Sequence, residues 1–346
     1  MSSPLPKVLL FGPRRSGKSS IKQVLFSKMS PHETLFRLES TPTPQHLIVD
    51  TNRLSQFELI DFPGDWDEAS NNPIFLGLSC FVFVLDAQDE PYDLVLSYLT
   101  NLISKATKVN PRIHVHVFIN KVDGELFLSE EAKYDCRRDI VSLVQEEMET
   151  FQGLDNVNVE YYLTSIYDHS VYESFSKVVQ KLVPALNTIE SLLNVLVERN
   201  GMEKAFLFDV ASKLYISTDS NPVDAAGYEL CSDMIDVVLD VSGIYGGRHN
   251  SDSNREIDDG SKGEGEGGEQ DKSVTEEEKN GYYDSESCAA IHLSNGIVLY
   301  LKEVESMLAL VCLTREESFG RRGLVDYNIG VFKEAIKKMI EVAGPK

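Results

Sequence analysis

Short apolar runs alternate with amphipathic stretches through the first half of the chain. The runs at Lys7–Phe11, Cys80–Leu85 and Val115–Ile119 are almost continuously apolar. This pattern is typical of strands buried on both faces by covering helices. Phe57–Ile60 and Val159–Leu163 are the other two strands that the pattern predicts here.

Helical periodicity fills the gaps between these strands, at Ser19–Lys28, Leu94–Val109, Glu130–Gln152 and Tyr172–Leu182. Strands that alternate with helices are joined by right-handed crossovers. We therefore predict an α/β fold with a doubly wound, mostly parallel sheet.

The second half has its strands and helices in blocks, which favours a small α+β domain with an antiparallel sheet. The turn Ser294-Asn295-Gly296 predicts a hairpin, because Asn and Gly tolerate positive φ. The predicted elements are a helix Thr188–Asn200 ended by Gly201, strands Ala205–Asp209 and Lys213–Thr218, a helix Tyr228–Val241, strands Ala289–Leu293, Ile297–Leu301 and Leu308–Leu313, and a helix Leu324–Val342.

Two domains fit the length of 346 residues, and Pro184 marks the predicted boundary between residues 1–184 and 185–346. Asn250–Asn280 holds eleven acidic and four basic residues with five glycines and almost no apolar residue. Such a segment buries too little surface to offset its chain entropy. We predict a disordered acidic insertion over about residues 246–283.

The net charge of −22, from 33 basic and 55 acidic residues, argues against binding to a nucleic-acid backbone. Five widely spaced cysteines without a C-x-x-C pair suit a reduced compartment and offer no zinc framework. No apolar run reaches 18 residues, and the sequence has no signal peptide or lipidation motif. We expect any membrane attachment to come through a partner.

Gly12–Ser19 (GPRRSGKS) matches the phosphate-loop pattern G-x-x-x-x-G-K-[ST] between an apolar strand and a helix. Backbone N–H groups and the helix N-terminus favour an anion there. Gly17 permits close approach, Lys18 reaches the β- and γ-phosphates, and the Ser19 hydroxyl ligates Mg²⁺. The predicted nucleotide contacts are Gly12, Arg14, Arg15, Ser16, Gly17, Lys18, Ser19 and Ser20.

Asp61-Phe62-Pro63-Gly64 follows the predicted strand Phe57–Ile60. The Asp61 carboxylate at this position can hold Mg²⁺ through water, and the Gly64 N–H can meet a γ-phosphate. The motif is weak by itself. Its place after a sheet strand, about forty residues beyond the phosphate loop, makes it informative.

Asn120-Lys121-Val122-Asp123 follows Val115–Ile119 and indicates guanine. The Asp123 carboxylate can accept hydrogen bonds from N1–H and the exocyclic amine of guanine, a pair of donors that adenine lacks. Asn120 can tie this loop to the phosphate loop, and the Lys121 stem can stack on the base.

Thr164, Ser165 and Ile166 follow the strand Val159–Leu163, where a backbone N–H could contact the guanine oxygen. All four segments lie at the carboxyl ends of strands, where open α/β sheets bind ligands. Together they predict a small GTPase domain that binds GTP or GDP with Mg²⁺.

The chain resembles the Rag GTPases, and among them the C/D-type subunit. The resemblance spans nearly the whole chain outside the acidic insertion, and it implies that the second domain is roadblock-like (longin-like). The segments that carry it include Gly12–Ser20, Met29–Phe36, Glu39-Ser40-Thr41, Asp61–Gly64, Lys108–Pro111, Tyr162–Ser170, Phe175–Leu182, Glu203–Val210, Ser232–Val238, Tyr300–Val304 and Leu308–Ser318.

In that family a threonine ahead of the second strand contacts Mg²⁺ and the γ-phosphate, and Thr41 matches its position, with Thr43 as a rival. Asp65 stands where a glutamine usually orients the attacking water. We expect Lys18, Thr41, Gly64 and Asp65 around the reacting phosphate, and Ser19, Thr41 and Asp61 around Mg²⁺.

Because Asp65 is short and charged, the sequence predicts slow intrinsic hydrolysis and a need for an activating protein, although Asp65 could equally point to solvent. Arg14 and Arg15 stand where many small GTPases have glycine, and an arginine there could stabilise transferred charge, lie over the nucleotide or face solvent. Trp66 is the single tryptophan and should report nucleotide exchange.

The resemblance implies a heterodimer with an A/B-type Rag subunit, formed through the second domain. It implies further a roadblock-containing scaffold at the lysosomal or vacuolar surface and signalling to the TORC1 complex. We expect a cytoplasmic protein that reaches this membrane through partners, with the nucleus as a second location. A scaffold that binds nucleotide without hydrolysing it is the alternative, whereas a small-molecule kinase would need an acceptor pocket that the sequence does not indicate.

Overall fold

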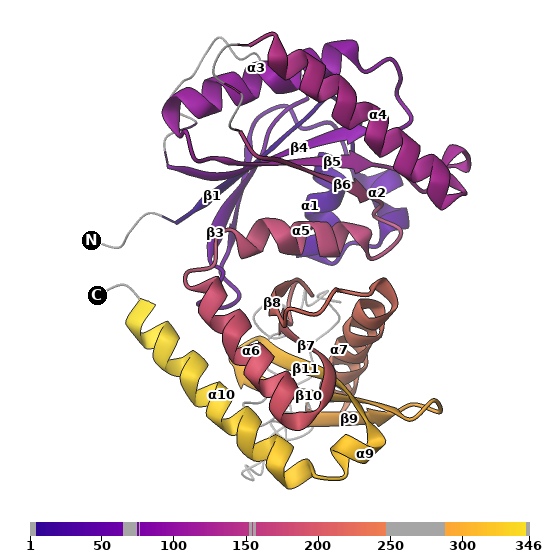
Figure 1. Cartoon of the computed structure of the whole chain (residues 1–346). Helices are drawn as coiled ribbons and strands as arrows, with labels where there is room; N and C mark the ends of the chain where they lie inside the picture. The colour runs from indigo at the N-terminus through magenta and orange to yellow at the C-terminus, as the bar shows by residue number, and fades with distance from the viewer. Residues whose placement is uncertain are drawn as a thin grey trace, which may run out of the picture.

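The computed structural model describes residues 5–64, 75, 77–151, 154, 157–246 and 288–343. In this part of the chain a six-stranded sheet and a five-stranded sheet form the centres of the two halves. The two halves stack one on the other, and both chain ends lie on the same side of the molecule (Figure 1). None of the helices described is long and apolar enough to cross a bilayer.

The first sheet has the strand order β2-β3-β1-β4-β5-β6. All neighbours run parallel except β2, which pairs antiparallel with β3 at the edge. The strands are β1 (Lys7–Phe11), β2 (Gln45–Val49), β3 (Phe57–Asp61), β4 (Leu78–Asp86), β5 (His114–Asn120) and β6 (Val159–Thr164).

Successive residues along the buried strands point to opposite faces of this sheet, so each strand contributes apolar side chains to both faces. Phe81 and Phe83 pack with α3 (Asp93–Val109) and α4 (Glu130–Glu149) on one face. Val82 and Val84 face the other side, toward α1 (Lys18–Ser27) and α5 (Ser170–Gln180). Figure 1 shows α3 and α4 above the sheet and α1 and α5 below it. The doubly wound α/β fold is therefore confirmed.

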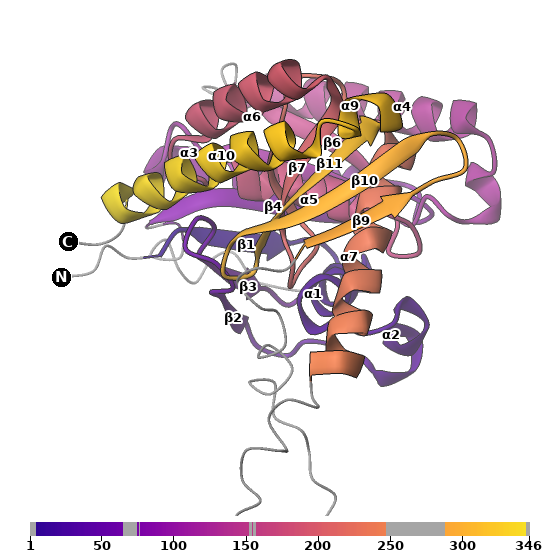
Figure 2. The ribbon, with the colours of Figure 1, turned by 90° about the horizontal axis from the view of Figure 1, so that it is seen from below.

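The second sheet is antiparallel, with the strand order β8-β7-β11-β10-β9. Helix α7 covers one face, whereas α6 and α10 lie side by side on the other (Figure 2). This arrangement is consistent with a roadblock-like domain. Its elements are α6 (Leu186–Asn200), β7 (Met202–Asp209), β8 (Tyr215–Thr218), α7 (Ala225–Gly246), β9 (Cys288–His292), β10 (Ile297–Glu305), β11 (Leu308–Arg315), α9 (Glu316–Phe319) and α10 (Arg322–Ala343).

Three elements were not expected from the sequence: β2, the short helix α2 (Pro31–Arg37) and the single turn α9. The β2 strand is exposed at four of its five positions to some degree, so it lacks the continuous apolar run of a central strand. The 3₁₀ turn η3 (Glu125–Phe127) was also missed. The predicted acidic insertion falls almost wholly on residues 247–287, outside the described residues.

Helix α5 lies between the two halves and belongs to the cores of both. Phe175 and Val178 lie in one continuous apolar cluster that runs from the first sheet to Leu193 of α6 and Leu207 of β7. The Tyr215 N–H of β8 donates to the buried Ser176 Oγ at 3.0 Å. The predicted boundary at Pro184 thus falls between two sheets that share part of one hydrophobic core.

A buried polar contact ties the β2–β3 turn to the second half. Asp209, at the end of β7, accepts a hydrogen bond from Asn52 Nδ2 at 3.2 Å and from the Ser212 backbone N–H at 3.1 Å. Asn52 Oδ1 in turn accepts from the N–H groups of Leu54 and Ser55 within its own turn. Burial raises the pKa of the Asp209 carboxyl, so these donors stabilise a costly charge.

We predict that Asn52→Ala lowers the free energy of unfolding by about 1–3 kcal/mol, because it leaves Asp209 short of a donor in a buried place. Equilibrium denaturation in urea measures this change. Asn101→Ala is the matched control, since Asn101 donates to the Ser97 carbonyl on an exposed face of α3. A loss for Asn52→Ala no larger than that for Asn101→Ala would contradict the role assigned to this contact.

Candidate functional site

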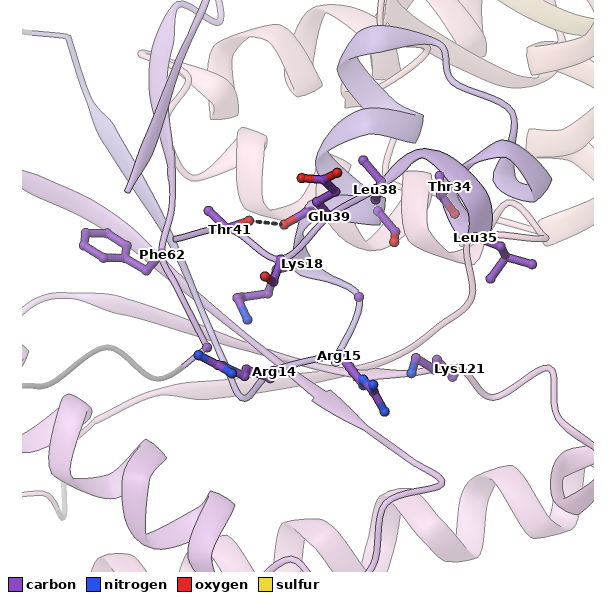
Figure 3. Close-up of a pocket in the computed structure, with 15 residues that line it drawn as sticks. Arg14, Arg15, Lys18, Thr34, Leu35, Leu38, Glu39, Thr41, Phe62 and Lys121 are labelled. Atoms are coloured by element: carbon purple, nitrogen blue, oxygen red, sulfur yellow. Dashed lines mark hydrogen bonds between the residues drawn. The ribbon is translucent and has the colours of Figure 1, made fainter. Parts of the chain in front are cut away.

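A cavity of about 760 Å³ lies where the strands of the first sheet end. Figure 3 shows Arg14 and Arg15 along one side of it, Thr41, Glu39 and Leu38 along another, and Lys18 between them. Of the predicted nucleotide residues, nine line this cavity: Arg14, Arg15, Gly17, Lys18, Ser19, Ser20, Thr41, Gly64 and Lys121.

The loop between β1 and α1 has a backbone path that requires glycine at two positions. Gly12 has φ +141° and Gly17 has φ +100°, and both values lie in the region that favours glycine. A Cβ on Gly12 would lie 2.0 Å from the Val84 carbonyl oxygen, and one on Gly17 would lie 2.3 Å from Asn120 Nδ2. The loop is therefore pressed against β4 and β5, and its N–H groups with the α1 N-terminus can receive an anion.

Lys18 opens α1 and is buried against the same loop. Its Nζ donates to the carbonyl oxygens of Gly12 at 2.7 Å and Pro13 at 2.8 Å. These two bonds hold the ammonium over the loop, at the cavity wall. This position suits a cation that contacts phosphates.

Three predicted Mg²⁺ residues from separate segments meet at one point. Ser19 Oγ donates to Asp61 Oδ2 at 2.7 Å and lies 3.0 Å from Thr41 Oγ1, the bond drawn from Thr41 in Figure 3. Thr43, the rival to Thr41, is exposed to solvent. The structure thus brings Thr41, rather than Thr43, to Ser19 and Asp61.

The donor set fits Mg²⁺, which takes oxygen ligands and keeps several waters. Asp61 Oδ1 is buried and has no hydrogen-bond partner among the residues described, so it is available to an ion or to a water on one. Over the same residues, no group of three or more His, Cys, Asp and Glu side chains could hold a metal. A single carboxylate with two hydroxyls is therefore the candidate site.

The expected guanine loop is joined to the phosphate loop through Asn120. Asn120 Nδ2 donates to the Ser16 carbonyl at 2.8 Å, and Asn120 Oδ1 accepts from Thr164 Oγ1 at 3.2 Å. Ser165 Oγ donates to Asp123 Oδ1 at 2.6 Å. These bonds fix the end of β5 against the end of β6, so Asp123 is held in place by its neighbours.

Lys121 adopts φ +68° and turns its side chain along the cavity wall. Its Nζ pairs with Asp86 Oδ2 at 2.6 Å, and its carbonyl accepts from Gln88 Nε2 at 2.8 Å. The stem is thereby fixed from both ends, which favours a stacking role against a flat ring.

On the cavity wall, Gly64 approaches Arg14 so closely that a Cβ would lie 2.3 Å from the Arg14 backbone nitrogen. Other predicted residues lie away from the wall. Ile166 packs at the edge of the core. Asp65 and Trp66 lie outside the described residues. The predicted residues absent from the cavity wall are Gly12, Ser16, Asp61, Asn120, Asp123, Thr164, Ser165 and Ile166.

Sequence reasoning missed one wall of the cavity, which α2 and the segment after it supply. Ser30 followed by Pro31 is a helix-start signal that could have located α2, because proline is favoured at the first helical position. The residues concerned are Thr34, Leu35, Leu38, Glu39 and Ser40.

Comparison with known proteins agrees with this geometry. The conserved region described as Gtr1/RagA G protein matches residues 7–235. Human Ras-related GTP-binding protein C is 48% identical over 341 residues, covering 97% of this chain and 77% of that protein. Schizosaccharomyces pombe GTP-binding protein gtr2 is 42% identical, covering 96% of this chain and 97% of that protein. Its gtr1 counterpart is 28% identical, covering 66% of this chain and 74% of that protein.

We predict that Asp123→Asn lowers GTP affinity by about a hundredfold or more and leaves the weak affinity for ATP unchanged, because the amide cannot accept both guanine donors. Competition titration of a fluorescent guanine nucleotide measures both affinities. Asp139→Asn, on the exposed face of α4, is the matched control. An equal loss for both nucleotides would show that Asp123 is only structural.

Proposed function

Because this chain belongs to the Gtr1/RagA family of G proteins and is a Rag GTPase of the C/D type, we propose that it is the guanine-nucleotide-dependent switch subunit of a Rag heterodimer and that it hydrolyses GTP slowly. The observation that carries the proposal is the meeting of Ser19, Thr41 and Asp61 beside the phosphate loop. Ser19 follows the phosphate loop, whereas Thr41 and Asp61 belong to two other segments. Their contacts therefore connect the phosphate loop to two segments that a γ-phosphate can order.

Different groups of the chain bind different parts of the nucleotide. The loop amides and Lys18 bind the phosphates, and Asp123 selects guanine. Mg²⁺, held through Ser19, Thr41 and Asp61, neutralises phosphate charge when bound. Thr41 and Gly64 then carry the signal, because their segments are ordered by the γ-phosphate and released after hydrolysis.

Slow hydrolysis follows from the position after Gly64. Asp65 is one methylene shorter than glutamine and negatively charged, so it is poorly suited to orient a water next to a triphosphate. We therefore propose that an activating protein supplies the missing catalytic group.

We predict that Asp65→Gln raises the single-turnover rate of GTP hydrolysis by about tenfold or more, because a neutral amide can orient the water. Asp65→Ala leaves the rate unchanged. Phosphate release from the preloaded full chain measures both rates. A lower rate for Asp65→Ala would show that Asp65 assists the reaction.

Since the chain is similar to gtr2 and more distantly to gtr1, we propose a heterodimer with an A/B-type Rag subunit, formed through the second domain. By extension we propose that the dimer sits on the lysosomal or vacuolar surface through a roadblock-containing scaffold. There it relays amino-acid availability to the TORC1 complex. In this proposal the subunit is cytoplasmic, with the nucleus as a second location, and reaches the membrane only through partners.

A non-catalytic scaffold that binds GTP or GDP is the second candidate, and Asp65 in place of glutamine favours it. The two functions differ in a single observable, the release of phosphate. No phosphate from the heterodimer, with or without an activating protein, would exclude the enzyme and leave the scaffold.

We predict that the purified chain retains GDP or GTP rather than ATP, and that Lys18→Ala lowers its affinity for guanine nucleotides by about tenfold to a hundredfold. The loss follows from removing a charged donor to the phosphates. Chromatography of the nucleotide released on denaturation and isothermal titration measure the two quantities. Equal retention of ATP, or full occupancy of Lys18→Ala, would overturn the proposed function.

A further inference from the structure

A second buried lysine lies one helical turn beyond Lys18 on α1. Lys22 is only 5% exposed, and its Nζ lies 3.1 Å from Asp61 Oδ2. The same Nζ donates to Gln45 Oε1 at 2.5 Å, at the start of β2. Lys22 belongs to neither the phosphate-loop motif nor the guanine motif, so the proposed function has no role for it.

Asp61, its partner, has no exposure to solvent. Oδ2 accepts from Ser19 Oγ at 2.7 Å and faces the Lys22 ammonium, whereas Oδ1 has no hydrogen-bond partner within the described ranges. A carboxylate buried without a counter-charge is strongly destabilising. The ammonium compensates this charge on one oxygen and leaves the other oxygen uncovered.

We propose that Lys22 is a positioning residue that serves as the resident counter-cation of Asp61. It holds the carboxylate by Oδ2 and stabilises the pocket when Mg²⁺ is absent. Its charge also weakens the attraction of the same carboxylate for Mg²⁺. A given Mg²⁺ concentration therefore slows nucleotide release less than it would without Lys22. This inference rests on the proposed function, since it assumes that Asp61 serves a Mg-nucleotide.

The physical reason is competition between two cations for one carboxylate. Unit charges a few ångströms apart interact much more strongly in a protein interior than in water. A divalent ion that depends on Asp61 is therefore repelled by Lys22, and the repulsion is not screened by salt as it would be at the surface. Without Lys22, the Asp61 charge has no resident counter-cation, so Asp61 is stabilised most by binding the metal.

Gln45 extends this contact to the loop that carries Thr41. Gln45 opens β2, four residues after Thr41, and accepts from the ammonium that also faces Asp61 at the end of β3. Lys22 thereby bridges the end of the segment that carries Thr41 and the start of the segment that carries Gly64.

The test is the Mg²⁺ dependence of GDP release from the purified full chain, followed with a fluorescent GDP analogue. For Lys22→Gln we expect the Mg²⁺ concentration that half-slows release to fall by about tenfold. Lys22→Arg, which keeps the charge, stays near the wild type. Lys28→Gln removes the same charge at the exposed end of α1 and is the matched control.

An unchanged or higher half-point for Lys22→Gln would overturn the proposal, as would an equal fall for Lys28→Gln. The wild type in this assay tests the proposed function separately. If wild-type chain does not bind the GDP analogue, the proposed function fails. If it binds and Lys22→Gln does not shift the half-point downward, only the role of Lys22 fails.

Thermal unfolding of nucleotide-free protein in a chelator gives a readout that does not involve catalysis. We expect Lys22→Gln to unfold at a lower temperature than the wild type and the double variant Lys22→Gln/Asp61→Asn to recover most of that loss, because it removes the buried charge that lost its partner. No recovery would mean that Lys22 acts by packing, and that result would contradict the proposal.

Discussion

The architecture of the site depends on one carboxylate that has no contact with solvent. Asp61 ends a central strand, and its charge must be balanced by groups that the fold brings to it. Ser19 and Lys22 supply that balance from one helix, and Gln45 ties the same ammonium to the edge strand. The helix that starts at the phosphate loop is thereby held against both strands of the β2–β3 hairpin. The carboxylate at the end of β3 therefore adds a buried polar connection between α1 and this hairpin, beside the contact of Ser19 Oγ with Thr41 Oγ1.

The same hairpin joins the site to the second half of the molecule. Thr41 precedes β2 and Gly64 follows β3, whereas the turn between the two strands carries Asn52, which donates to the buried Asp209 of β7. The helix α5 adds an apolar connection, because its residues pack on the first sheet and continue into the cluster around α6. A displacement of the hairpin at its nucleotide end must therefore be absorbed either within its two strands or at the contact between the halves. This places the second sheet in mechanical contact with the switch segments.

Sequence patterns predicted what depends on burial and on short motifs. The apolar runs at β1, β4 and β5 are compatible with few structures other than a central strand. The glycines of the phosphate loop cannot be replaced by a residue with a Cβ, because Val84 and Asn120 lie too close. The edge strand β2 was missed because its outward residues are polar or exposed, and α2 because seven residues give little periodicity. Lys22 could not be predicted as a partner of Asp61, since a lysine on a helix is more often solvated and nothing in the sequence brings these two positions together. Pairing across elements is decided by tertiary packing.

Two buried lysines on one helix serve different purposes because their partners differ. Lys18 donates to the carbonyl oxygens of Gly12 and Pro13, which orient its ammonium over the loop to which the proposed function assigns the phosphates. Lys22 faces the Asp61 carboxylate, so its positive charge compensates a negative charge of the protein itself. The chain as a whole carries a charge of −22, which would repel an anionic ligand at long range, yet such repulsion is screened beyond about 8 Å at physiological salt. The proposed function therefore assigns the affinity for a nucleotide to local groups, the loop amides and Lys18, and the proposal for Lys22 assigns to it how strongly that affinity depends on the metal.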